Sequence, residues 1–349
     1  MSSPQPADLA YQNEILQGVS RTFALTIPQL PGSLEQVVGN AYLLCRIADT
    51  IEDDKHLPFA DKRQFSERFI EVVNGSEESE RFAQDLKPKL SPSATDSERD
   101  LIHNTPTVIR ITHSFNPRQQ AALQRCVRIM ADGMSRYQET NVAYGLQDQA
   151  DMDSYCYYVA GVVGEMLTEL FCDYSGAIDR NHEEMMQLAV SFGQGLQMTN
   201  ILKDIWDDQQ RNMCWLPQAV LERYGVSFNA ATPLRNDQQF RQALGHLIGV
   251  ARMHLGNALH YTLLLPKHET GIRRFCLWAL GMAVLTLRNI NNHRDFTSGN
   301  EVKISRRAVK ATILSTNLCT RHDLLLRWLF NRLASGLPAP ATPAKAGIR

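Results

Sequence analysis

Proline is missing from two long stretches of this chain. None occurs between Pro117 and Pro217 or between Pro266 and Pro338, although the sequence holds 15 prolines. Proline breaks the interior of a helix, so long runs without it that carry apolar residues every three to four positions predict helices. This spacing recurs in Leu123, Val127, Met130 and Met134, and again in Phe275, Leu277, Leu280 and Val284. Strand-like alternation and hairpin dipeptides are scarce. We therefore predict an all-α fold.

The composition excludes several classes of protein. The 349 residues are 44% apolar, which allows a large buried core, and 36 basic residues stand against 37 acidic ones. This balance offers no positive surface, so we expect no nucleic-acid partner. The seven cysteines are scattered without CxxC spacing, which is typical of buried thiols in a reducing compartment. The N-terminus lacks the features of a signal peptide, and no window reaches roughly 20 uninterrupted apolar residues. We expect a cytoplasmic protein.

Two acidic sets share one spacing. In GQGLQMTNILKDIWDD, residues 193–208, three aspartates lie at i, i+3 and i+4 and so occupy one face of a helix, with Gln197 and Asn200 upstream on that face. AYLLCRIADTIEDD, residues 41–54, repeats the spacing. The two sets are Asp204, Asp207 and Asp208, and Asp49, Glu52 and Asp53. A single acidic cluster is most often a solvated face, but two matched sets indicate a shared role.

Several common chemistries have no motif in this sequence. It contains no GxxxxGK[ST] phosphate loop, no HExxH and no GxSxG, and its ten histidines are isolated from one another and from the acidic sets. A histidine-based zinc site is therefore not expected. Carboxylate-only sites suit hard cations, and Mg²⁺ takes one or two protein carboxylates while keeping water and phosphate oxygens. The two sets predict a diphosphate substrate held through Mg²⁺.

A helix rich in small residues is predicted between the acidic sets. In DSYCYYVAGVVGEMLTELF, residues 153–171, tyrosine and aliphatic side chains recur at helical spacing beside Ala160, Gly161 and Gly164. Glycine lets a ligand or another helix approach the backbone closely. Tight helix packing is the simpler interpretation. Aromatic rings beside a carbocation are the alternative.

Five segments together resemble the squalene and phytoene synthase family, the head-to-head prenyl diphosphate synthases. They are SRTFA (20–24), DTIED (49–53), YCYYVAGVVG (155–164), QMTNILKDIWDD (197–208) and FCLWALGMAVLTLRNINNHRDF (275–296) with VKISRR (302–307). They occur in the family's order. The fifth is closer to squalene synthases than to phytoene enzymes.

The resemblance implies an all-α prenyl synthase fold with a central cavity between helices, and a metal-dependent transferase of prenyl groups. Its members join two farnesyl diphosphates head to head through presqualene diphosphate, and squalene synthases then reduce this intermediate with NADPH. The implied cofactors are therefore Mg²⁺ and NADPH. The implied metal ligands are Asp49, Glu52, Asp53, Asp204 and Asp208.

The resemblance also assigns individual roles. Tyr155 matches the tyrosine linked to the first half-reaction, Arg46 and Tyr42 lie where residues close to the departing diphosphate are found, and Phe275 matches an aromatic of the second half-reaction. Lys303, Arg306 and Asn200 are the implied cofactor contacts. The implied substrate contacts are Ser20, Arg21, Phe23, Val159, Val163, Leu167, Gln197, Lys203 and Arg211.

Three positions depart from the family pattern. Lys203 stands where arginine is frequent, which keeps the charge but loses a planar two-pronged donor. Met213 and Ser305 replace residues that are usually basic. These departures affect the reductive half more than the condensing half. Two alternatives therefore stay open: a synthase of the same fold that stops without reduction, releasing presqualene diphosphate, dehydrosqualene, hydroxysqualene or phytoene, and a catalytically silent helical isoprenoid-binding protein.

The C-terminal region carries the last expectations. We predict one domain over residues 1–336 and a disordered tail over 337–349. DLLLRWLFNRLASG, residues 323–336, mixes Leu, Trp and Phe with two arginines. Packing against the domain is the commoner explanation of such a segment, and peripheral contact with a membrane is the alternative. The sequence does not determine the oligomeric state, and a monomer is favoured.

Overall fold

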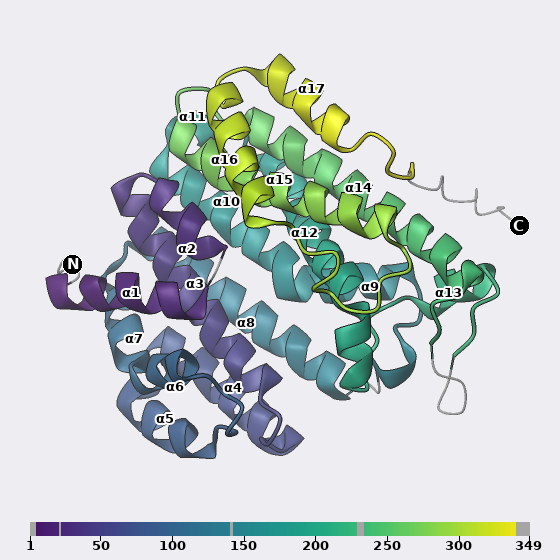
Figure 1. The fold of residues 1–349 in the computed structure, drawn as a ribbon. Coiled ribbons are helices and arrows are strands. Elements are labelled where there is room, and N and C mark those ends of the chain that lie inside the picture. Colours follow the sequence, from purple (N-terminus) through teal and green to yellow (C-terminus); the bar gives the residue numbers. More distant parts are fainter. Residues whose placement is uncertain (1–4, 21, 140–141, 229–233, 340–349) are drawn as a thin grey trace, which may run out of the picture. The chain divides into compact units, whose positions relative to one another are not determined.

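The structure is a computed structural model, and it describes residues 5–20, 22–139, 142–228 and 234–339. In these ranges every named element is helical, and the single pairing of extended backbone is an isolated parallel bridge between Leu146 and Pro217. Figure 1 shows the helices in chain order. The all-α prediction is confirmed.

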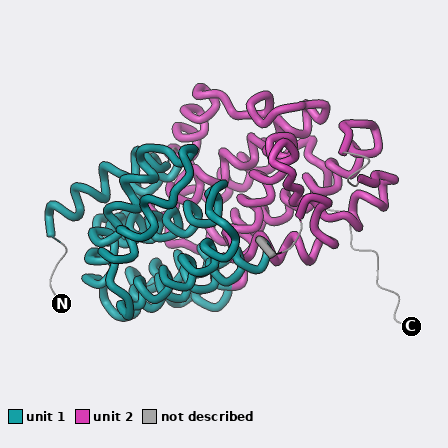
Figure 2. Tube along the Cα trace, turned by 90° about the horizontal axis from the view of Figure 1, so that it is seen from below, with its two compact units in different colours: residues 1–140, 162–186 teal, residues 141–161, 187–349 magenta. Residues whose placement is uncertain are grey.

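The chain divides into two compact units, coloured separately in Figure 2. Unit 1 comprises residues 1–140 and 162–186, and unit 2 comprises residues 141–161 and 187–349. The single domain expected over residues 1–336 stays a prediction. In the tail, Leu337 is buried, and its carbonyl accepts a hydrogen bond of 2.6 Å from Arg252 Nη1. The prediction of disorder is therefore wrong at that residue, while residues 340–349 lie outside the described part.

Unit 1 holds ten α-helices in its described residues: α1 (Pro6–Val19), α2 (Phe23–Thr26), α3 (Gly32–Asp53), α4 (Phe59–Asn74), α5 (Ser79–Leu86), α6 (Asp96–His103), α7 (Thr105–Ser114), α8 (Pro117–Glu139), α10 (Val162–Tyr174) and α11 (Gly176–Asp179). Short 3₁₀ turns follow α2 at Ile27–Gln29 and α5 at Lys87–Lys89. Helix α3 packs against α1, α4, α7, α8 and α10 and is the centre of this unit.

A buried polar contact fixes α3 against α7. Asn40, which is fully buried, donates through Nδ2 to the Val108 carbonyl at 2.9 Å and accepts from Thr112 Oγ1 at 2.8 Å. A buried amide that lost these partners would carry the full cost of desolvation. These hydrogen bonds therefore favour one register of α3, the helix that ends in the first acidic set.

Unit 2 contains the remaining described helices. They are the 3₁₀ turn Val142–Tyr144, α9 (Gln149–Cys156), a π-helical turn (Tyr157–Gly161), α12 (His182–Gln210, which begins in unit 1), α13 (Gln218–Arg223), α14 (Gln238–Leu264), α15 (Thr270–Asn292), α16 (Arg306–Cys319) and α17 (Asp323–Leu333). The longest helices are α12 and α14, with 29 and 27 residues, and α12 lies within the first of the two proline-free stretches, as predicted.

Helix α15 is the hydrophobic centre of unit 2. Among the described helices it is the one with the length and composition of a membrane span, but 67% of that window is buried inside the protein. A core helix has the same properties. It packs on α14, α16 and α17. Near its start, the fully buried Arg273 donates to Asp323 Oδ1 of α17 at 2.5 Å, which pairs the two helices.

Candidate active site

The first acidic set lies at the C-terminal end of α3 in unit 1. The apolar face of this helix is buried through Leu44, Ile47 and Ile51, whereas Asp49 and Glu52 are half-buried and Asp53 is exposed. The predicted shared face is therefore partly accessible to solvent. This is what a binding role requires of carboxylates.

The next acid along, Asp54, has a structural role. Its Oδ1 accepts from the backbone N–H groups of His56 at 2.8 Å and Leu57 at 3.0 Å, and its Oδ2 accepts from Ser91 N–H at 2.7 Å. These bonds turn the chain at the end of α3 and hold the loop that contains Ser91. Because both carboxylate oxygens of Asp54 accept backbone hydrogen bonds, we do not count Asp54 among the binding carboxylates, and Asp53 is the last of them.

The ionised form of Asp49 is unfavourable when no cation is bound beside it. Removal of its carboxylate from water, together with repulsion from Asp53, raises its pKa to about 7, and Arg46 only partly opposes this. Arg46 forms an ion pair with Glu98 of α6, and its Nε has no hydrogen-bond partner among the described residues. The cation nearest to this set on α3 is thus already engaged.

Sequence reasoning missed Glu98. Its carboxylate also forms a capping box at the start of α6, accepting from Thr95 N–H at 2.8 Å while Thr95 Oγ1 accepts from Glu98 N–H at 3.2 Å. The T-x-x-E pattern is a local signal for such a cap. It does not reveal the partner on α3, because Arg46 is 52 residues away.

The early segment joins the same part of unit 1. Ser20 Oγ accepts from Phe23 N–H at 3.0 Å, and Tyr42 donates its hydroxyl proton to the Val19 carbonyl at 3.0 Å. The rings of Phe23 and Tyr42 are 5.3 Å apart, and burial raises the pKa of Tyr42. Ser20, Phe23 and Tyr42 are therefore brought together, with Tyr42 one turn of α3 before Arg46, and their roles in binding stay predictions. Arg21 lies outside the described residues.

The second acidic set lies near the end of α12 in unit 2. The opposite side of the helix is buried through Ile201, Leu202, Ile205 and Trp206, and the Trp206 ring packs on Phe240 at 5.3 Å. Gln197, Asp204 and Asp207 are half-buried and Asn200 is exposed. The polar stripe predicted from the sequence is thus the accessible face of this helix.

Each of two carboxylates in this set has a cation beside it. Lys203 Nζ lies 3.1 Å from Asp204 Oδ2, and Arg211 forms an ion pair with Asp208. Asp208 is buried, and burial raises its pKa to about 6 even though Arg211 opposes the shift. The predicted substrate contacts Lys203 and Arg211 therefore lie beside the metal ligands expected from the sequence.

Tyr155 is buried in unit 2 against an aromatic ring that the sequence did not indicate. Its ring stacks on Trp215 with centroids 4.0 Å apart and planes 7° from parallel. Trp215 is 60 residues away, and an isolated tryptophan in a loop carries no signal for this contact. The stacked pair orients the Tyr155 ring.

The small residues after Tyr155 serve close packing. A Cβ on Gly193 of α12 would lie 2.2 Å from the Ala160 carbonyl oxygen, a separation that real Cβ atoms do not show. Ala160 belongs to the π-helical turn, a feature often found at functional sites. The packing interpretation is confirmed for this contact. A role for the segment beside a carbocation stays a prediction.

The remaining predicted residues are distributed between the units. Val159 in unit 2 and Val163 and Leu167 on α10 in unit 1 are half-buried, and Phe275 is buried on α15. Lys303 and Arg306 are exposed. Ser305, the position that departs from the family pattern, caps α16: its Oγ accepts from Ala308 N–H at 3.1 Å.

The carboxylates fit Mg²⁺. All donors are oxygens, and burial, with a smaller contribution from neighbouring carboxylates, raises the pKa values of Asp49 and Asp208, so a divalent cation would stabilise their ionised forms. Within the residues that the structure describes, no three His, Cys, Asp or Glu side chains converge as a complete metal cage. Mg²⁺ commonly takes one or two protein carboxylates together with substrate oxygens, so two partial sets suit a metal that arrives with a diphosphate.

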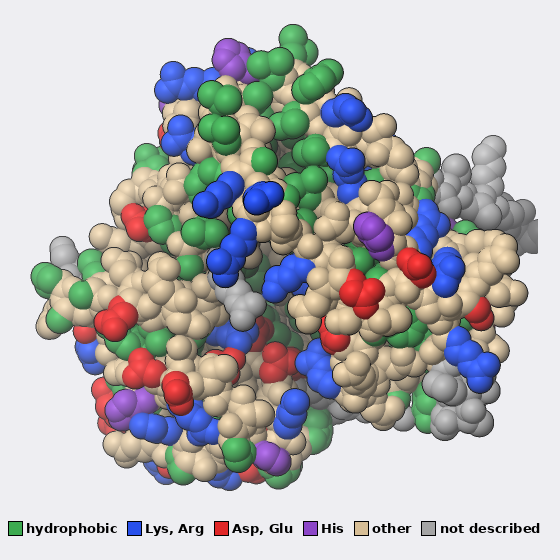
Figure 3. All heavy atoms as spheres, viewed as in Figure 1, with side chains coloured by type: hydrophobic (Ala, Val, Ile, Leu, Met, Phe, Trp, Pro, Cys, Tyr) green, Lys and Arg blue, Asp and Glu red, His purple; other side chains and the backbone are tan. Residues whose placement is uncertain are grey.

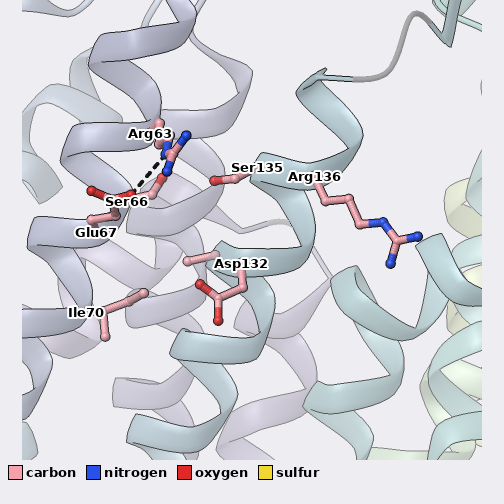
Figure 4. Close-up of a pocket in the computed structure, with 8 residues that line it drawn as sticks. Arg63, Ser66, Glu67, Ile70, Asp132, Ser135 and Arg136 are labelled. Carbon is pink, nitrogen blue, oxygen red and sulfur yellow. Dashed lines mark hydrogen bonds and ion pairs between the residues drawn. The ribbon is translucent and has the colours of Figure 1, made fainter.

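A separate groove in unit 1 does not include any predicted site residue. It has a volume of about 370 Å³ and lies between α4 and α8, where Arg63 pairs with Glu67 and Asp132 faces them from α8 (Figure 4). Ser66 and Ser135 also line it. A lining this polar is unsuited to a hydrocarbon chain.

Comparison with known proteins decides the family. The family model for squalene/phytoene synthase matches residues 16–308, which include all five segments identified above. The chain belongs to the squalene/phytoene synthase family. It is 31% identical to squalene synthase ERG9 of Saccharomyces cerevisiae over 328 residues, covering 92% of this chain and 71% of that protein. It is 29% identical to squalene synthase of Schizosaccharomyces pombe, covering 93% and 68% respectively.

Solved structures share the fold. The structure of TcSQS with a ligand matches with a TM-score of 0.70 at 24% identity, covering 94% of this chain and 98% of that one. A dehydrosqualene synthase in complex with a ligand matches with a TM-score of 0.63 at 20% identity, covering 89% and 96%. At these identities the likeness shows the fold alone, and it confirms the predicted synthase fold.

Proposed function

We propose that this chain is a squalene synthase, which joins two farnesyl diphosphates head to head through presqualene diphosphate and reduces the intermediate to squalene. The observation that carries the proposal is the pair of acidic sets on α3 and α12, each with one partly accessible face, in a chain of this family. The two relatives named above are squalene synthases.

In this proposal the acidic sets bind the diphosphates. Asp49, Glu52 and Asp53 on one helix and Asp204 and Asp208 on the other would hold Mg²⁺. When bound, Mg²⁺ would offset the charge that develops on the departing diphosphate. Arg46, Lys203 and Arg211 supply further positive charge beside these carboxylates. Ser20, Arg21, Gln197 and Asn200 complete the proposed polar contacts.

Tyr155 acts in the first condensation. Its stacking on Trp215 gives the ring a defined orientation, so the hydroxyl can steer the proton that is lost when the cyclopropane closes, or orient the departing diphosphate. Help of this kind is typically worth about 10² to 10⁴ in rate. Apolar walls that include Val159, Val163 and Leu167 keep water from the cation.

The reductive half is assigned to Phe275, Lys303 and Arg306. NADPH would supply the hydride for the final carbon centre. Phe275 is buried and contributes to a dry wall, whereas Lys303 and Arg306 are exposed and can bind the phosphates of the dinucleotide. The N-cap on Ser305 supports this assignment, because it starts α16 with two arginines in its first turn.

A product assay tests the proposal. Purified protein is incubated with farnesyl diphosphate and Mg²⁺, with and without NADPH, and the extract is analysed by mass. We expect squalene with NADPH, and presqualene diphosphate or its breakdown products without it. Products that are the same under both conditions would favour the non-reductive alternative, and unchanged substrate would favour the silent binding protein.

Peripheral attachment to a membrane is the second part of the proposal. Five large apolar side chains of α16 and α17 are 48 to 82% exposed, and Figure 3 shows apolar side chains gathered over these helices with Lys and Arg beside them. They are Leu314, Leu318, Leu324, Leu325 and Trp328. Residues 302–339 contain seven Lys or Arg and one acid, Asp323, which pairs with Arg273 and Lys267. This charge favours an anionic bilayer.

Vesicle sedimentation tests the attachment. We expect the protein to bind vesicles that contain phosphatidylserine and to bind neutral phosphatidylcholine vesicles less. Leu324→Ser with Trp328→Ser should release it, whereas Met253→Ser, at an exposed apolar residue of α14, should not. Concentration-dependent dimerisation that the same pair of changes abolishes would instead assign this surface to a second copy of the chain.

A further inference from the structure

Asp207, the middle carboxylate of the second acidic set, has a different kind of partner from Asp204 and Asp208. Asp204 lies beside Lys203, and Asp208 pairs with Arg211. Asp207 Oδ2 instead accepts a hydrogen bond of 3.3 Å from the backbone N–H of Gly299. Gly299 belongs to the loop between α15 and α16, 92 residues further along the chain. One helix face thus contains two types of carboxylate.

Gly299 approaches α12 more closely than any other residue type could. A Cβ at this position would lie 2.8 Å from Asp204 Oδ1, 2.9 Å from Asp207 Oδ2 and 3.1 Å from the Lys203 carbonyl oxygen. The first two separations are shorter than real Cβ contacts, and the third would press on backbone. Gly299 does not have a positive φ. A larger residue here would force the Asp204 and Asp207 carboxylates to shift, so glycine suits this position for space, not for backbone conformation.

The rest of this loop is anchored at its two ends. Phe296 is buried, with its ring edge-on to Trp206 at 6.5 Å, and its carbonyl accepts from Asn236 Nδ2 at 2.9 Å. Val302 is fully buried, and its carbonyl accepts from Asn289 Nδ2 at 3.1 Å. Between these anchors, Gly299 contacts the acidic set.

The basic residues of the reductive half follow this loop directly. Lys303 comes one residue after Val302, and Arg306 is the first residue of α16. The contact of Gly299 with α12 and the anchor at Val302 together set where these two side chains begin. The contact between Gly299 and the acidic set can thus affect the positions of Lys303 and Arg306, which lie a few residues further along the backbone.

We propose that Asp207 is a positioning residue and not a metal ligand, and that its hydrogen bond to Gly299 sets Lys303 and Arg306 relative to the carboxylates of Asp204 and Asp208. This inference rests on the proposed function. It separates two carboxylates that bind the metal from one that holds the loop. Asp207 is thereby assigned to the reductive half of the reaction.

Kinetics of two variants of Asp207 test the assignment. In Asp207→Ala we expect the KM for NADPH to rise about tenfold, the order expected when a hydrogen bond to a charged group is lost. Diphosphate release without NADPH, and its dependence on Mg²⁺, should stay within about threefold, because a residue that does not bind the metal leaves the first condensation intact. Asp207→Asn keeps an acceptor oxygen and should restore most of the KM.

The glycine provides the reciprocal test. Gly299→Ala should raise the KM for NADPH at least as much as Asp207→Ala, and it should also slow the first condensation, since its Cβ crowds Asp204. The matched control is Gly256→Ala on α14, where a Cβ would meet nothing within 4 Å. We expect this control to behave like the unchanged protein in both steps.

Hydrogen exchange reports on the anchor without any catalysis. In Asp207→Ala the amide of Gly299 should exchange faster than in the unchanged protein, while Asp204→Ala should leave it slow. The proposal is overturned if Asp207→Ala raises the Mg²⁺ requirement as much as Asp204→Asn does, or if both the KM for NADPH and the exchange of Gly299 are unchanged. If the unchanged protein makes no squalene, the proposed function fails, and the exchange measurement still decides the anchor.

Discussion

The two acidic sets have the same spacing and different surroundings. On α3, burial and repulsion from Asp53 raise the pKa of Asp49 to about 7, and the cation one turn before it, Arg46, is paired with Glu98 and opposes this shift only in part. On α12, Lys203 and Arg211 stand beside Asp204 and Asp208, and the pKa of the buried Asp208 rises to about 6. The difference indicates that the first set depends more on an added cation than the second. Equal spacing thus does not give equal electrostatics.

The largest expected effect comes from removing one metal ligand in either set. Asp49→Asn and Asp204→Asn should each lower diphosphate release about 10³-fold, since a bound metal stabilises the developing charge by several kcal/mol. Far-UV circular dichroism should show unchanged helix content. Asp132→Asn, in the separate groove between α4 and α8, is the control and should be active. Turnover within a few fold in either variant would remove that set from the metal site.

A smaller effect should follow when Arg46 is released. Glu98→Gln keeps a residue that supports the capping box of α6 but loses the charge that engages Arg46. Arg46 is then free to neutralise Asp49, so the Mg²⁺ concentration for half-maximal activity should rise about tenfold, the lower end of the effect of partners behind metal ligands. The matched control is Glu77→Gln, which breaks the Arg68 pair elsewhere in unit 1. An unchanged Mg²⁺ requirement would contradict the comparison.

The pKa of Asp49 predicts a dependence of stability on pH. A carboxyl whose folded-state pKa is raised from an ordinary 3.8 to about 7 contributes stability that is fully present below the unfolded pKa and is lost as the pH rises through 7. Without Mg²⁺, the Tm should therefore fall between pH 4 and pH 7 by a few degrees more than in Asp49→Asn. Mg²⁺ should raise the Tm more at pH 8 than at pH 5. Parallel pH profiles of the two proteins would show that Asp49 is not strained.

The smallest expected effect lies in the second set. Arg211 is half-exposed, and exposed ion pairs contribute little. Arg211→Gln should shift the Mg²⁺ requirement by no more than about threefold, in the direction of tighter binding because Asp208 loses a competing cation. Titration of activity with Mg²⁺ measures this shift. A loss of activity as large as that of Asp204→Asn would show that the proposed contact of Arg211 with the substrate outweighs its ion pair with Asp208, and that the two sets are more alike than their ion pairs suggest.

Local patterns accounted for the helices and the two acidic faces. The scarcity of proline and the apolar periodicity placed α8, α12 and α15, because both signals act over one or two helical turns. The same holds for Asp49 and Asp204, since residues at i, i+3 and i+4 share a face in any α-helix. Ser305, which caps α16, also has a local signal, because serine is a preferred residue at the start of a helix.

The tertiary structure decided which partner each of these side chains has. Arg46 meets Glu98 across 52 residues, Tyr155 stacks on Trp215 across 60, and Asp207 accepts from Gly299 across 92. Spacing along one helix determines which side chains share a face, but it carries no information about what packs against that face. Whether a carboxylate is free to bind a metal or is engaged by a loop depends on contacts between distant segments, and only the folded chain specifies those contacts.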